Sequence, residues 1–227
     1  MVTDKGVIRP LFECLLTTLC NVSPYLKTMS MVGASKLMAL FEAFASKKFL
    51  YSSERNHQYV YLLLELFNNI IQYQYEGNIQ LIYSLLRKKE IFSELNGNID
   101  LELIVAGLKR KKEVQFIPTD EWLSTWKPKL PLKTILTLLK ILVPEVEDLC
   151  SKSGSNTEED ILLYLKKTTL VGLLPVPHTI VIRTFGSNPM IDAFVTTYLW
   201  GLIYLRNQYP PLFDAKAIKL FKVNIIE

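Results

Sequence analysis

Reactive side chains are scarce in this sequence, and each scarcity removes a class of protein. Among 227 residues there are two histidines, His57 and His178, and three cysteines, Cys14, Cys20 and Cys150. A zinc site needs about four clustered nitrogen, sulfur or oxygen ligands, and neither histidine has such neighbours. The nine glycines are scattered singly, so no phosphate-binding loop, dinucleotide fingerprint or nucleophile elbow is present. We therefore predict no metal, no cofactor and no enzymatic activity.

Charge and hydrophobic runs exclude further classes. The formal charge of +4 is too slight to indicate a nucleic-acid partner. The longest apolar runs, 168–182 and 193–205, are broken by prolines or end at Arg206, and both are too short to cross a bilayer. The first residues contain Asp4 and no apolar stretch, unlike a secretory signal. An odd number of cysteines at irregular spacing is typical of a reducing compartment.

Hydrophobic residues, nearly half of the chain, recur at helical spacing and predict an all-α fold. The longer predicted helices cover residues 7–21, 24–45, 56–75, 132–152 and 190–207. Helices of two to five turns with short loops favour stacked helical hairpins of the armadillo or HEAT type. An irregular helical bundle fits nearly as well, because the sequence has no clean internal repeat.

A weakly patterned, basic stretch separates two helical halves. Asn96-Gly97-Asn98 is a turn signal, and the charge block at 109–112 is typical of a solvated segment. A short helix at 101–108 lies between them. We predict an N-terminal helical half at 1–95, a flexible basic linker at 96–118 and a C-terminal helical half at 119–227, the halves packed as one helical unit.

Residues 169–183, TLVGLLPVPHTIVIR, are apolar almost throughout, yet Gly172, Pro175 and Pro177 prevent a regular helix. Such a segment should be covered by protein, because large exposed apolar patches are rare. The other helices are therefore predicted to pack around it. It is interpreted either as a buried connector between two helices or as a docking surface for a partner. The candidate partner contacts within it are Leu174, Pro175, Pro177 and His178.

Two aromatic and three amide side chains are further candidates. Trp122 and Trp126 lie four residues apart and share one helix face. Aromatic anchors dominate interface energetics, so both are candidate partner contacts. Asn68, Asn69 and Gln72 interrupt an apolar helix. Buried amides need hydrogen-bond partners, so we predict that these three brace the structure.

Two basic clusters carry the alternative hypothesis of direct lipid binding. Their members are Arg87, Lys88, Lys89, Lys109, Arg110, Lys111 and Lys112. Near an anionic membrane surface each cation contributes about 1 kcal/mol of attraction. A solvated helix end and a solvated linker are the competing interpretation.

Six sequence blocks, in order along the chain, are similar to the C-terminal part of one family. They are SPYLKTMSMV (23–32), LFEAF (40–44), ELFNNIIQYQYEGN (65–78), EWLSTWKPKLPLKTI (121–135), TLVGLLPVPHTIVIR (169–183) and TYLWGLIYLRN (197–207). The chain resembles the high-temperature-induced dauer-forming protein family, relatives of dymeclin. The similarity covers residues 20–95 and 119–222.

The resemblance implies a non-enzymatic, cytosolic protein peripheral to the Golgi. It implies a scaffold or adaptor role at the trans-Golgi network in secretory-granule (dense-core vesicle) formation and protein sorting. The implied partners are proteins at the Golgi surface, with weak anionic membrane contact as the alternative and no small-molecule substrate. Relatives are longer and begin with a myristoylated glycine, whereas Val2 stands here. A C-terminal fragment or a truncated gene model is therefore expected, and relatives carry a longer insert at 96–118.

Overall fold

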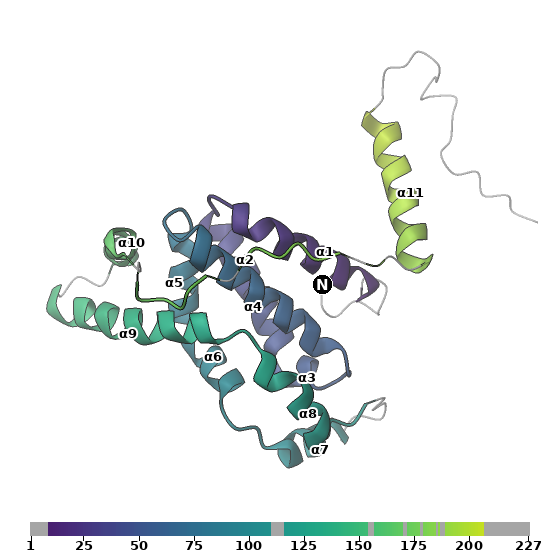
Figure 1. The fold of residues 1–227 in the computed structure, drawn as a ribbon, viewed down its shortest axis with the longest axis horizontal. Helices are drawn as coiled ribbons and strands as arrows, with labels where there is room; N and C mark the ends of the chain where they lie inside the picture. The colour runs from purple at the N-terminus through teal and green to yellow at the C-terminus, as the bar shows by residue number, and fades with distance from the viewer. Residues whose placement is uncertain are drawn as a thin grey trace, which may run out of the picture. The chain divides into compact units, whose positions relative to one another are not determined.

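The computed structural model describes residues 9–109, 116–153, 157–169, 172–177, 179–184, 186 and 189–206. In these residues all regular secondary structure is helical (Figure 1), which confirms the predicted all-α fold class. The chain divides into two compact units, residues 1–184 and 185–227, which are described separately.

The first unit contains ten α-helices among its described residues. They are α1 (Arg9–Val22), α2 (Met31–Ala45), α3 (Lys47–Leu50), α4 (Asn56–Tyr73), α5 (Ile79–Arg87), α6 (Lys89–Asn96), α7 (Leu101–Lys109), α8 (Asp120–Trp126), α9 (Lys133–Ser153) and α10 (Glu158–Lys167). Two 3-10 turns, η1 (Ser23–Tyr25) and η2 (Lys127–Lys129), join α1 to α2 and α8 to α9. The second unit is described by α11 (Pro189–Arg206).

One predicted helix start is wrong, and a capping interaction explains the difference. The helix predicted at 24–45 begins at Met31, because the Ser30 side chain accepts a hydrogen bond from the Gly33 N–H at 3.1 Å. Pro24 lies in η1 instead. The helix predicted at 132–152 is present as α9, which continues through Pro144 without a break. The short helix predicted at 101–108 is present as α7.

α4 is the central helix of the first unit, in contact with α1, η1, α2, α3 and α9 (Figure 1). Its buried residues lie on nearly all sides, as expected for a helix enclosed by others. They are Asn56, Val60, Leu62, Leu63, Leu64, Leu66, Phe67, Asn68, Asn69, Ile70 and Ile71. Contacts also join α2 to α5 and α5 to α10. A solenoid pairs each repeat mainly with its sequence neighbours, so the described contacts fit the irregular helical bundle.

Three phenylalanines join α2, α4 and α6 at the centre of the core. The ring of Phe41 lies 5.2 Å from that of Phe67 and 5.1 Å from that of Phe92, measured between centroids. All three side chains are fully buried. Aromatic pairs at such separations contribute about 0.5–1.5 kcal/mol beyond the area they bury. This trio therefore holds helices that the sequence separates widely.

The amides of α4 hold neighbouring elements in place. The Asn69 amide donates to the Ser23 hydroxyl at 2.9 Å and to the Cys20 carbonyl at 3.3 Å. The Asn68 amide donates to the carbonyl of Pro131 at 2.7 Å. The Gln72 amide donates to the Thr134 hydroxyl at 3.4 Å on α9. One helix thereby fixes both the end of α1 and the approach to α9.

The stretch predicted as a linker, 96–118, is only partly described, and its flexibility stays a prediction. The ammonium group of Lys127, beyond it, donates to the carbonyl of Gly97 at its start. α4, α5 and α6, which precede it, pack against α9, which follows it.

None of the described helices is long and apolar enough to span a membrane.

Candidate protein-binding surface

The apolar segment 169–183 lies on the surface of the first unit, not at its centre. Val176 is 90% exposed, and Val181 and Ile182 are each 60% exposed. The described residues 172–177 and 179–183 are non-helical. Gly172 has a φ of 76°, which glycine adopts at little cost. The buried-connector interpretation is therefore wrong for these residues. A non-helical segment inside a helical core would leave backbone N–H and C=O groups without partners, so this segment stays in contact with water.

Arg183 fixes the end of this segment to two helices. Its backbone N–H donates to the Asn21 side chain at 2.8 Å, and the Asn21 amide donates to its carbonyl at 2.9 Å. Its guanidinium lies 5.2 Å from the centroid of the Tyr61 ring. One guanidinium nitrogen lies 3.4 Å from a carboxylate oxygen of Glu65, whose side chain is only 13% exposed. The segment is thus attached to α1 and α4, while Val176, Val181 and Ile182 face solvent.

The first part of the segment borders a cavity of about 750 Å³. Leu174, Pro175 and Pro177 line it together with the ends of α4 and α10. Leu174 also packs against the hydrophobic core and is half-buried. Three of the four predicted contacts in this segment therefore lie together beside one cavity. The fourth, His178, lies outside the described residues.

Trp122 and Trp126, both on α8, belong to one aromatic cluster with Tyr51 and His57. Trp126 is buried because His57 stacks on it at 5.0 Å between ring centroids and Tyr51 lies 6.5 Å away. Its prediction as an exposed partner contact is therefore corrected: Trp126 is a core residue. Trp122 is half-exposed, and its indole N–H donates to the carbonyl of Glu54 at 3.3 Å. Its role in partner binding stays a prediction.

His57 should make the stability of this cluster depend on pH. Burial lowers the pKa of His57 below 6.5, while its hydrogen bond to the Glu54 carbonyl acts in the opposite direction. The unfolded chain therefore binds the proton more readily. Stability should be complete above pH 6.5 and decrease as the pH falls through the lowered pKa. Urea unfolding at a pH of about 7.5 and about 5.5 would measure this dependence.

A His57→Phe variant supplies the control, because it retains a ring against Trp126 and has no titrating group. Its difference in unfolding free energy between the two pH values should be smaller than that of the wild type. Equal differences in both proteins would assign the pH dependence to carboxylates elsewhere.

The basic cluster at the end of α5 is largely paired. The two ion pairs are Lys88–Glu42 and Lys89–Glu147, each with 2.7 Å between nitrogen and oxygen. Arg87 lies over a tyrosine ring, 5.7 Å from its centroid. The side chains at 109–112 lie outside the described residues. Because Glu42 and Glu147 neutralise Lys88 and Lys89, this cluster attracts an anionic membrane less strongly than the sequence alone indicates. Lipid binding stays a prediction.

Reactive chemistry is sparse in the described part of the chain. Among the described residues, no group of three or more His, Cys, Asp or Glu side chains is placed to bind a metal ion. Burial raises the pKa of the Cys20 thiol, although Arg183 beside it acts in the opposite direction. This thiol therefore lacks the lowered pKa of a nucleophilic cysteine. The exposed apolar segment, fixed at Arg183, is the candidate site: of its two interpretations the buried connector is wrong for the described residues, and the docking surface stays a prediction.

An α-helical bundle with an exposed, anchored apolar segment defines the structural class, and sequence comparison supplies the family. Residues 3–202 match the family model of dymeclin, described as the Dyggve-Melchior-Clausen syndrome protein. The chain therefore belongs to the dymeclin family.

Its relatives confirm the resemblance found in the sequence. Protein HID1 of Homo sapiens is 35% identical over 309 aligned positions, which cover 95% of this chain and 39% of the relative. Protein HID1 of Dictyostelium discoideum is 28% identical over 346 positions, covering 98% of this chain and 38% of the relative. The chain thus spans about two fifths of the length of these relatives.

A shorter similarity links the chain to the Ubp5-interacting protein ftp105 of Schizosaccharomyces pombe. The two are 34% identical over 83 residues, which cover 37% of this chain and 9% of the relative. The name of that relative describes it as Ubp5-interacting. No solved structure matches this chain.

Proposed function

We propose that this chain is a non-enzymatic scaffold or adaptor that binds proteins at the cytosolic surface of the trans-Golgi network. In this role it contributes to the formation of secretory granules (dense-core vesicles) and to protein sorting. Membership of the dymeclin family supports the proposal, and so does the name of the fission yeast relative. The observation that carries it is the exposed apolar surface of residues 172–177 and 179–183, anchored at Arg183, because apolar surface held in place is typical of interaction sites.

Proximity labelling in secretory cells tests the proposal. The wild-type chain should label proteins of the Golgi surface. A Val176→Asp, Val181→Asp double variant should lose most of this labelling, because a carboxylate at each position cannot be buried against an apolar partner. Both valines are at least 60% exposed, so the free chain should fold normally.

Val32→Asp is the matched control, since Val32 is 68% exposed on α2, within a different element. It should retain wild-type labelling. Retention by the double variant as well would contradict a role for the segment. Labelling of another compartment by the wild-type chain would contradict the Golgi location.

A further inference from the structure

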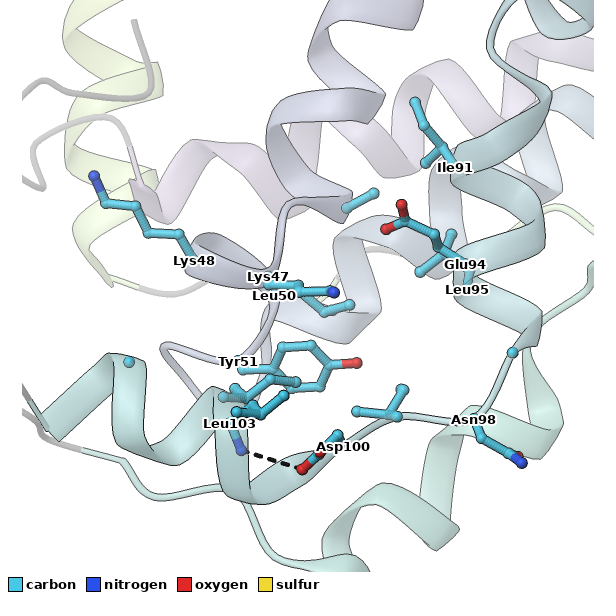
Figure 2. Close-up of a pocket in the computed structure, with 15 residues that line it drawn as sticks. Lys47, Lys48, Leu50, Tyr51, Ile91, Glu94, Leu95, Asn98, Asp100 and Leu103 are labelled. Atoms are coloured by element: carbon cyan, nitrogen blue, oxygen red, sulfur yellow. Dashed lines mark hydrogen bonds between the residues drawn. The ribbon is translucent and has the colours of Figure 1, made fainter.

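A second cavity, of about 590 Å³, lies on a different part of the first unit. Its walls come from α3, α6 and α7, and the apolar side chains of Leu50, Leu95 and Ile104 contribute to its lining (Figure 2). This volume is in the range of ligand-binding pockets, which are mainly apolar with a few polar groups. The proposed adaptor surface does not include the residues that line this cavity.

Tyr51 provides a polar group directed into the cavity. Its side chain is 3% exposed, and its ring packs against Trp122 with 6.2 Å between centroids. The hydroxyl points toward the cavity (Figure 2) and has no hydrogen-bond partner among the described residues. Burial raises the pKa of Tyr51 to about 12, so the hydroxyl remains protonated and can donate a hydrogen bond at neutral pH. Because this hydroxyl borders the cavity and makes no hydrogen bond to the described residues, it is free to donate to an acceptor on a ligand.

Charges of opposite sign face the cavity from opposite walls. The ammonium group of Lys47 on α3 and the carboxylate of Glu94 on α6 both point toward it, whereas Lys48 points away (Figure 2). In the described part of the chain neither Lys47 nor Glu94 has an ion-pair partner. Asp100 also lies at the rim, where its carboxylate accepts the Leu103 N–H at 3.2 Å and caps α7.

We propose that this cavity binds a short linear peptide whose apolar side chains are flanked by one acidic and one basic residue. The apolar residue fills the cavity floor, and a backbone carbonyl accepts the hydrogen bond of Tyr51. The acidic residue of the peptide pairs with Lys47 and the basic one with Glu94. A simple anionic amphiphile such as a fatty acid would meet Glu94 and Asp100, and a cationic one would meet Lys47. The two-sided charge therefore favours a peptide.

The test begins with a displayed library of random twelve-residue peptides, selected against the wild-type chain. Enriched peptides are then synthesised with a fluorescent label, and their dissociation constants are measured by anisotropy. Gly107 lines the cavity, and a Cβ placed there meets no other atom within 4 Å. The backbone therefore accepts a side chain at this position, and the bulky indole of Gly107→Trp should obstruct the cavity and weaken binding at least about tenfold.

Ala106→Trp is the matched control, because Ala106 is an exposed neighbour on α7 that does not line this cavity. It should bind the peptides as the wild type does. Tyr51→Phe removes only the hydroxyl and should weaken binding about fivefold. Unfolding midpoints of all three variants establish that each is folded.

Charge reversal tests the wall that carries Lys47. Lys47→Glu should weaken an enriched peptide about tenfold, and a peptide whose acidic residue is replaced by lysine should recover affinity for that variant. Enrichment of no peptide would overturn the proposal. Equal binding to Gly107→Trp and the wild type would also overturn it. Palmitate binding that Gly107→Trp abolishes, with no peptide enriched, would assign the cavity to an amphiphile and overturn the proposal. The substitutions at Val176 and Val181 lie in a different surface, so a failure here is distinguishable from a failure of the adaptor proposal.

Discussion

Replacing Gly77 with alanine is expected to destabilise the first unit by about 3–5 kcal/mol or more, the range of severe point mutations. A Cβ at this position would lie 1.8 Å from the carbonyl oxygen of Lys27 and 3.0 Å from its carbonyl carbon. Both are backbone atoms and cannot rotate aside as a flexible side chain can. Alanine at residue 77 would therefore force the connection between α4 and α5 away from the connection between α1 and α2.

The neighbouring residue makes this displacement more costly. The amide of Asn78, which is fully buried, donates to the carbonyls of Leu26 at 2.8 Å and Gln74 at 2.8 Å. It also lies 3.2 Å from the same Lys27 carbonyl. Buried donors that lose their partners cost about 1–3 kcal/mol each. The clash at residue 77 and the lost hydrogen bonds of Asn78 should therefore both lower the free energy of unfolding.

Urea unfolding followed by circular dichroism measures the effect, with Gly107→Ala as the control. A Cβ at Gly107 meets nothing within 4 Å. Because alanine favours the interior of a helix, the control should gain about 0.5–1 kcal/mol. A Gly77→Ala variant within about 1 kcal/mol of the wild type would contradict the close backbone approach.

Local signals in the sequence predicted the helices better than their packing. The hydroxyls of Thr119 and Thr157 cap α8 and α10, accepting hydrogen bonds from the backbone N–H groups of Trp122 and Asp160. These interactions depend on residues three positions apart, which a sequence displays directly. The start of the second helix was missed because Ser23 and Ser30 both precede plausible first turns, and only tertiary packing selects Ser30.

The candidate surface was recognisable as apolar and non-helical but not as exposed. Prolines and hydropathy in 169–183 describe local conformation, whereas exposure depends on which elements surround it. Arg183 had one detectable signal, since it is the first charged residue after a long apolar run. Its partners Asn21 and Glu65 lie more than a hundred residues away, so no spacing rule connects them. The cavity of about 590 Å³ could not be predicted either, because the residues that line it come from separate helices, α3, α6 and α7.

Replacing Phe41 with alanine is the second change with a large expected effect, a loss of about 3–5 kcal/mol in the free energy of unfolding. Phe41 is completely buried, and its ring contacts both Phe67 and Phe92. The substitution removes the aromatic contacts and leaves a cavity among α2, α4 and α6. Three helices must move together to close that cavity, so little of the loss should be recovered. Tyr25→Ala, at a 60% exposed position, should change stability by about 0.5 kcal/mol or less.

A double-mutant cycle with Phe92→Ala tests whether the trio acts as a unit. Because Phe41 and Phe92 stack with only 15° between their ring planes, removing one leaves the other partly unsupported. The double variant should therefore lose less than the sum of the single losses, by about 0.5–1.5 kcal/mol. Phe92 also lies on α6, whose Leu95 lines the peptide cavity. Loosening α6 should weaken peptide binding in Phe92→Ala even where the protein remains folded. Full additivity together with unchanged peptide affinity would show that α6 is held by other contacts.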